Sequence, residues 1–63
     1  MRLIKLTEFK YTREIYINVS RLVAFWEEGG ATYFITTYGG NALGRVKETP
    51  EEIIELIKQA EEI

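Results

Sequence analysis

Along most of the chain, apolar residues alternate with other residues in short runs, which is the spacing of a half-buried β-strand. In the run at residues 14–19, Ile15, Ile17 and Val19 fall on one face of an extended chain. Turn-forming or charged residues interrupt the pattern at residues 10–13, 18–21, 28–30 and 38–41. The pattern therefore predicts five short strands, at about residues 2–9, 14–18, 22–28, 31–37 and 42–47.

After residue 48 the apolar side chains recur at steps of three and four residues, as on one face of an α-helix. Thr49 and Glu52 have the spacing of a capping box, in which each side chain accepts a hydrogen bond from the other residue's backbone N–H. Pro50 stands at the first helical position, where a missing N–H costs nothing. We therefore expect one amphipathic helix over about residues 50–62, frayed at its C-terminal end because two glutamates there oppose the helix dipole. Its apolar face comprises Ile53, Leu56, Ile57, Ala60 and Ile63.

Short connections between the strands favour an antiparallel meander, because consecutive strands then lie next to each other. The helix has one obvious role, which is to cover one face of that sheet. We therefore expect a single α+β domain over residues 1–63. Its architecture is a meander of four to five short strands, or one that curls towards a small barrel, with one C-terminal amphipathic helix.

The stretch Tyr38–Val46 (YGGNALGRV) has the glycine spacing of a phosphate-binding loop, with Gly39 and Gly44 in the two required places. Arg45 stands where that loop needs lysine, and the next residue lacks the hydroxyl that would bind magnesium. The residues that follow have the pattern of a strand, so no helix N-terminus points at the loop to bind an anion. We therefore interpret residues 39–41 as a hairpin turn and Gly44 as a bulge or a close backbone contact.

The composition excludes most enzyme chemistry. The chain has no Cys, no His and one serine, Ser20, so a nucleophile paired with histidine is impossible. Disulfides and the common structural zinc sites are excluded for the same reason. Every acidic residue is Glu, and the adjacent pair Glu27–Glu28 points to opposite faces of a strand. We expect no catalytic activity, no cofactor and no metal, and, with no signal peptide or membrane-spanning run, a cytoplasmic protein.

The net charge of −2 is unevenly distributed along the chain. Residues 1–49 hold seven of the eight Lys and Arg residues, five of the ten Glu residues and all eight aromatics. Arginines beside aromatics are typical of sequence-tolerant binders of single-stranded nucleic acid, although the acidic total opposes phosphate binding. A small nucleic-acid-binding protein, of a kind that phages also encode, is therefore the alternative function. Its candidate residues are Arg13, Arg21, Arg45 and Tyr16.

The strands predicted at residues 22–28 and 31–37 have no polar face, unlike a sheet with one side in water. One short helix covers only one face of the sheet, and a chain this small without disulfide or metal needs another source of stability. We therefore expect a homo-oligomer, most simply a two-fold dimer, or contact with another protein. Strict alternation gives two candidate contact pairs, which are Trp26 with Phe34 and, on the opposite faces, Phe25 with Tyr33. Strand edges are a second possible contact.

Several segments together resemble a known family. These are Met1–Thr7 (MRLIKLT), Ile15–Asn18 (IYIN), the apolar pair Leu22 and Phe25, and Val46–Thr49 (VKET) leading into Glu51–Ile54 (EEII). The chain resembles the small FlbD-type flagellar proteins, which are also called the swarming motility protein SwrD. The resemblance covers most of the chain and implies a cytoplasmic, non-enzymatic accessory protein that supports flagellar motor function. It implies no catalytic residues.

Overall fold

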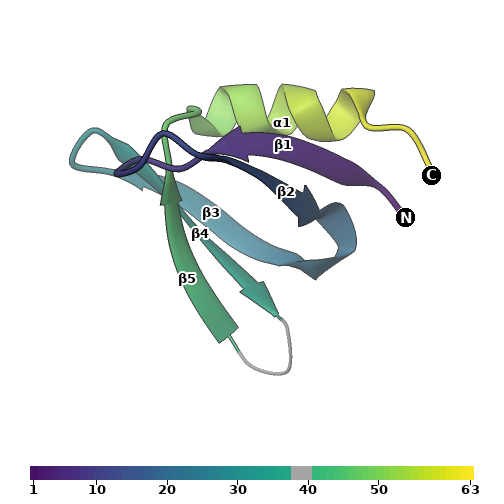
Figure 1. Cartoon of the computed structure of the whole chain (residues 1–63), viewed down its shortest axis with the longest axis horizontal. Helices are drawn as coiled ribbons and strands as arrows, with labels where there is room; N and C mark the ends of the chain where they lie inside the picture. Colours follow the sequence, from purple (N-terminus) through teal and green to yellow (C-terminus); the bar gives the residue numbers. More distant parts are fainter. Residues whose placement is uncertain (38–40) are drawn as a thin grey trace.

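The computed structural model describes residues 1–37 and 41–63. The chain forms five strands and one α-helix, and a 3₁₀ turn, η1, joins β2 to β3 (Figure 1). This confirms the α+β class, and the predicted strand limits agree with the observed ones to within two residues. The elements in chain order are β1 (Leu3–Thr7), β2 (Glu14–Asn18), η1 (Val19–Arg21), β3 (Leu22–Glu28), β4 (Ala31–Thr37), β5 (Asn41–Val46) and α1 (Pro50–Gln59).

The strands form two antiparallel sheets, the hairpin β1–β2 and the three-stranded sheet β3–β4–β5. Backbone hydrogen bonds join the two sheets where the end of β1 crosses the end of β5. There the Phe9 amide donates to the Arg45 carbonyl at 3.1 Å and the Lys47 amide to the Thr7 carbonyl at 2.9 Å. Because β5 turns away from β1 beyond this crossing, the strands do not close into the small barrel that was one predicted option (Figure 1).

The β3–β4 hairpin turns where the sequence predicts a break. Gly29 and Gly30 have φ angles of 61° and 83°, the left-handed region in which a side chain is strained. Two such residues in a row suit the tight turn of an antiparallel hairpin. In the second predicted turn, Gly39 and Gly40 lie outside the described residues.

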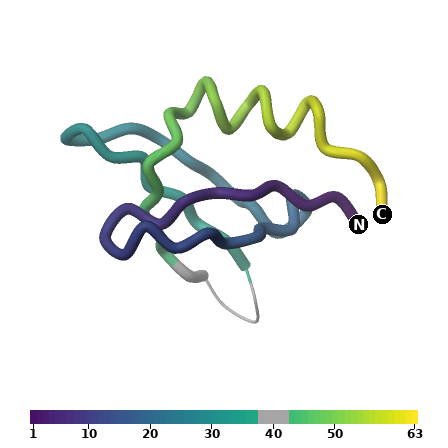
Figure 2. Tube along the Cα trace, turned by 45° about the horizontal axis from the view of Figure 1, so that its top comes forward, coloured from purple at the N-terminus to yellow at the C-terminus, as the bar shows by residue number. Residues whose placement is uncertain are grey.

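The core lies between the β1–β2 hairpin, the inner face of the three-stranded sheet and the helix (Figure 2). Alternation along the first two strands is confirmed, since Ile4, Leu6 and Ile17 are buried while Lys5 and Tyr16 are exposed. The fully buried side chains of Leu6, Val46 and Ile53 bring one residue each from β1, β5 and α1. Each of these elements therefore contributes to a single core.

The helix begins as predicted, with a capping box at Thr49. The Thr49 hydroxyl accepts from the Glu52 amide at 3.2 Å, and the Glu52 carboxylate accepts from the Thr49 amide at 3.0 Å. These bonds satisfy two of the backbone N–H groups that every helix N-terminus leaves without a partner.

The helix ends at Gln59, three residues before the predicted limit of 62. Arg2 accounts for this end, because its guanidinium donates to the carbonyls of Ile57 and, at 3.2 Å, of Ala60. The last residues then run back beside β1, where the Ile63 amide donates to the Met1 carbonyl at 2.8 Å. The two ends of the chain therefore lie side by side (Figures 1 and 2).

Candidate functional site

The face of the three-stranded sheet that points away from the core is the candidate site. Trp26, Tyr33 and Arg45 are register partners across β3, β4 and β5, and the β1–β5 crossing places Phe9 beside Arg45. Ala24, Ile35 and Leu43 form the neighbouring row. These seven residues, which lie outside the core cluster, are called the outer sheet face below: Phe9, Ala24, Trp26, Tyr33, Ile35, Leu43 and Arg45.

The first row consists of two stacked pairs. The rings of Trp26 and Tyr33 lie nearly parallel, with centroids 5.9 Å apart and 16° between the planes. The Arg45 guanidinium lies over the Phe9 ring, 4.5 Å from its centroid. The indole N–H of Trp26 donates to the carboxylate of Glu28 at 3.3 Å. The row therefore runs from an acidic end at β3, through aromatic rings, to a basic residue on β5.

Much of this surface is open to solvent, although its side chains are apolar. Leu43 is 67% exposed, Phe9 39% and Trp26 36%, and Val23, at the edge of the sheet, is 59% exposed. Single exposed apolar residues are ordinary on a protein surface, but neighbours on one sheet face form a contiguous patch. Patches of this kind mark contact surfaces.

A β-bulge at Val23 places Leu22 and Phe25 on the same face of β3. The pairing shifts between Leu22 and Ala24, so that two residues of β3 stand opposite one residue of β4. As a result Leu22 and Phe25 both pack against the core, although strict alternation predicts opposite faces for them.

The register of β3 with β4 corrects the predicted contact pairs. Phe25 is the register partner of Phe34 on the inner face, and Trp26 is that of Tyr33 on the outer face. The predicted grouping of Trp26 with Phe34 and of Phe25 with Tyr33 is therefore wrong. Phe34 is only 6% exposed, so it contacts the core and is not available to a partner.

Gly44 is a close backbone contact, which is one of the two predicted roles. It lies opposite Phe34 in the register, and a Cβ at this position would lie 2.3 Å from Cζ of the Phe34 ring. The ring therefore occupies the space of the missing side chain. This inner-face contact fixes the phase of β5 and leaves Leu43 and Arg45 on the outer face, where both are exposed.

The four residues of the nucleic-acid alternative do not form one surface. Arg13 pairs with Glu8, with its Nε 2.6 Å from one carboxylate oxygen and its Nη2 3.3 Å from the other. This hydrogen bond, and then the charge of Glu8, raise the pKa of the Arg13 guanidinium. Arg21 ends η1, beyond the far end of β2. Of the four, Arg45 lies on the outer sheet face.

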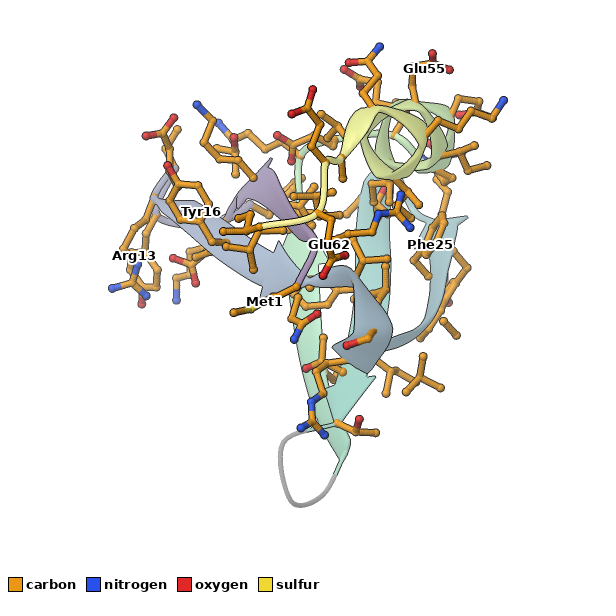
Figure 3. All side chains as sticks on the ribbon, turned by 90° about the vertical axis from the view of Figure 1, so that its right-hand side faces the viewer. Met1, Arg13, Tyr16, Phe25, Glu55 and Glu62 are labelled. Carbon is orange, nitrogen blue, oxygen red and sulfur yellow. The ribbon has the colours of Figure 1, made fainter. Side chains whose placement is uncertain are left out.

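Tyr16 lies on β2 opposite Lys5, and it is 65% exposed. The Lys5 ammonium is 3.2 Å from the Glu14 carboxylate, which raises the pKa of Lys5 first through the hydrogen bond and then through its charge. Tyr16 and Arg13 lie on the opposite side of the molecule from Phe25 (Figure 3). Tyr16 lies beside the charged pair of Lys5 and Glu14 on the β1–β2 hairpin and is not a member of the row across β3, β4 and β5.

Phe9 was not among the residues that the sequence suggested. The signal was present, because Ile4, Leu6 and Glu8 alternate with Lys5, Thr7 and Phe9, so Phe9 shares the outward phase. What the pattern does not reveal is the crossing of β1 over β5, which brings the Phe9 ring to Arg45.

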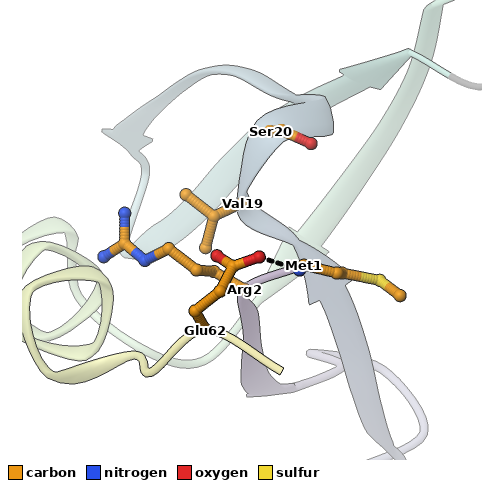
Figure 4. Close-up of a pocket in the computed structure, with 5 residues that line it drawn as sticks. All are labelled: Met1, Arg2, Val19, Ser20 and Glu62. Carbon is orange, nitrogen blue, oxygen red and sulfur yellow. Dashed lines mark hydrogen bonds and ion pairs between the residues drawn. The ribbon is translucent and has the colours of Figure 1, made fainter.

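One cleft, of about 350 Å³, lies where the two ends of the chain meet (Figure 4). Its polar side chains already have partners within the protein. Arg2 donates to the end of α1, and the Glu62 carboxylate binds the amino group of Met1. A ligand site needs polar groups that converge on the ligand. Because the polar groups here bind other parts of the chain, we interpret this cleft as the place where the two chain ends are held together. It is lined by Met1, Arg2, Val19, Ser20 and Glu62.

A second cleft, of about 390 Å³, lies between β1 and α1. Two of its carboxylates stabilise local structure. Glu48 accepts from the Thr7 amide at 2.8 Å and from the Thr7 hydroxyl at 2.9 Å, and Glu52 belongs to the capping box. The cleft is lined by Lys5, Glu48, Glu52, Glu55, Leu56 and Gln59.

Among residues 1–37 and 41–63, no three His, Cys, Asp or Glu side chains gather as a metal site would require. Within the same part of the chain, no helix is both long enough and apolar enough to cross a membrane. Comparison of the chain with protein-family models, with curated proteins and with solved structures finds no match.

Proposed function

We propose that this protein is a non-enzymatic protein-interaction module and that its contact surface is the outer sheet face. The observation that carries the proposal is the row in which Trp26 stacks on Tyr33 beside Arg45, on a sheet face open to solvent. Trp, Tyr and Arg are the residue types that dominate binding energy in protein interfaces. An antiparallel sheet that only faced water would carry polar side chains at these positions.

The absence of catalysis is part of the proposal, and the chemistry of the chain supports it. Without His or Cys, general acid–base work would fall to Glu, Lys or Tyr side chains. Glu8, Glu48 and Glu52 each bind a residue of the same chain and so have structural roles. Beside the outer sheet face, the carboxylate of Glu28 accepts a hydrogen bond from Trp26.

The resemblance to FlbD-type proteins suggests which partners to test first. If the protein acts as that resemblance implies, it is an accessory factor of the flagellar motor that works in the cytoplasm. The outer sheet face would then contact a motor component or another copy of the accessory protein.

Site-specific photo-crosslinking in the producing cell tests the interaction proposal. Leu43 is replaced by p-benzoyl-phenylalanine, since its side chain is 67% exposed on the outer sheet face and the change leaves the core intact. The same replacement at Tyr16, which is 65% exposed on β2, is the matched control. We expect a discrete protein adduct from position 43 and none from position 16. No adduct from either position, or adducts from both alike, would contradict the proposal.

The alternative is a small protein that binds single-stranded nucleic acid, and the same row favours it. Phe9, Tyr33 and Trp26 offer ring faces on which bases stack, and Arg45 offers a positive charge. The net charge of −2 opposes it, because phosphate binding depends on excess positive charge. We therefore expect weak or no binding of a fluorescent poly-dT oligonucleotide at low salt. Tight binding whose logarithm falls linearly with log salt would favour the alternative.

A further inference from the structure

We propose that the partner of the outer sheet face is a second copy of this chain, packed face to face about a two-fold axis parallel to β4. The inference deepens the proposed function and rests on it, because it assigns a partner to the same surface. It follows from how charge and aromatic side chains are arranged across the three strands.

The outer sheet face is asymmetric from one side to the other. Arg45 lies on β5, Tyr33 lies on β4 between the two sides, and Trp26 lies on β3 with its indole bound to Glu28. A two-fold axis parallel to β4 exchanges the two sides, so β5 of one copy lies over β3 of the other. Arg45 then faces Trp26 and Glu28 of the second copy, and the two Tyr33 rings meet near the axis.

Each such contact is favourable, and the symmetry repeats it. A guanidinium over an indole ring is attracted by the ring, and tryptophan is the most favourable aromatic for this interaction. The Trp26 indole bonds one oxygen of the Glu28 carboxylate, and a carboxylate accepts several hydrogen bonds. Arg45 of the second copy can therefore bond to Glu28 without displacing the indole.

The other face-to-face arrangement is unfavourable. A two-fold axis across the strands places β3 over β3 and β5 over β5 of the second copy, so Arg45 does not reach Glu28. Where that axis passes through the row of Arg45, the two Arg45 side chains meet. Like charges across an interface oppose association. The charge pattern therefore selects the axis along β4.

The size of the face sets the strength of the contact. Strands of up to seven residues, spaced about 4.8 Å apart, give a three-stranded face of roughly 14 by 23 Å. This is smaller than the roughly 800 Å² that each partner buries in a standard stable interface. We therefore expect a weak, reversible dimer that dissociates on dilution.

A charge swap tests both the partner and the axis. Arg45→Glu places a carboxylate opposite Glu28 twice in each dimer, so we expect the dimer Kd to rise at least about tenfold. Arg45→Glu combined with Glu28→Arg restores opposite charges, so we expect a return to within about threefold of the original Kd. Arg21→Glu makes the same change in net charge outside the outer sheet face and is expected to leave the Kd unchanged. Sedimentation equilibrium over about 10 µM to 1 mM measures each Kd.

Circular dichroism and thermal melting establish that each variant is folded. If Arg45→Glu fails to fold without its contact to Phe9, Leu43→Glu replaces it, because that exposed side chain also lies in the proposed interface. A wild-type mass of one chain at every concentration overturns the proposal, as does a folded double variant that stays monomeric. If the protein is monomeric and position 43 crosslinks to a different protein, the partner is not a second copy. The proposed function is then still supported. A monomer that binds poly-dT through Arg45 overturns both.

Discussion

At the scale of single residues, the lack of a side chain at Gly44 determines which residues of β5 point outward. The Phe34 ring occupies the space beside Gly44, so a methyl group there would lie 2.3 Å from Cζ of the ring. The neighbours of Gly44, Leu43 and Arg45, then carry the exposed side chains of the strand. The packing of Gly44 against Phe34 in the core is therefore linked to the exposure of Leu43 and Arg45 on the opposite face.

Gly44→Ala should destabilise the protein because the ring cannot move without disturbing the core. Forcing an extra methyl group into a packed core typically costs about 1–3 kcal/mol. Urea unfolding followed by tryptophan fluorescence measures the change in the free energy of unfolding. Leu43→Ala, one residue away and outside the core, is the control and should cost less than Gly44→Ala. Equal costs for the two variants would show that the Phe34 contact does not constrain the strand.

At the scale of elements, local sequence patterns predicted the features that depend on neighbouring residues. They did not predict the features that depend on contacts between distant parts of the chain. The alternating runs and turn residues predicted all five strands, and the spacing of Thr49 and Glu52 predicted the start of the helix. The end of the helix was missed because Arg2 caps it from the other end of the chain. No pattern within residues 50–62 contains that contact.

The same difference between local and long-range information explains which features of the candidate site could be predicted. From Leu22 to Trp26 every residue of β3 is apolar, so no polar position marks which face is outward, and the bulge at Val23 is invisible in the pattern. The sequence therefore suggested Trp26 and Tyr33 as candidate contact residues but placed them on different faces. The register, which depends on pairing with β4, was needed to bring them together.

The capping box allows a prediction at this scale. Thr49→Ala removes the hydroxyl that accepts from the Glu52 amide, and the loss of such a cap costs about 0.5–2 kcal/mol. For a domain of this size, 1 kcal/mol corresponds to roughly 4–8 °C in melting temperature. Thr49→Ser keeps the hydroxyl and is the control. If Thr49→Ala melts within a degree of the wild type, the helix is not part of the cooperative unit.

At the scale of the whole molecule, 63 residues leave little margin of stability. A chain of about 60 residues buries only about 60% of the surface that it exposes when unfolded. This protein has no cysteine with which to add a disulfide, and its core is centred on six buried apolar side chains. The arrangement of two small sheets also could not be predicted from the sequence, because it depends on how β1 crosses β5.

If a second copy covers the outer sheet face, stability and concentration are linked, and melting measures the link directly. Association with the folded state alone stabilises it by mass action, so the melting temperature rises with protein concentration. Above the Kd, each tenfold increase in concentration contributes about 1.4 kcal/mol per dimer, or about 0.7 kcal/mol per chain. That corresponds to a rise of roughly 3–6 °C per tenfold increase. For Arg45→Glu the rise in melting temperature should begin at a higher protein concentration, because the repulsion from Glu28 weakens the dimer. A wild-type melting temperature that stays constant from about 10 µM to 1 mM would show that the folded chain is stable alone and would exclude a second copy as the partner of the outer sheet face.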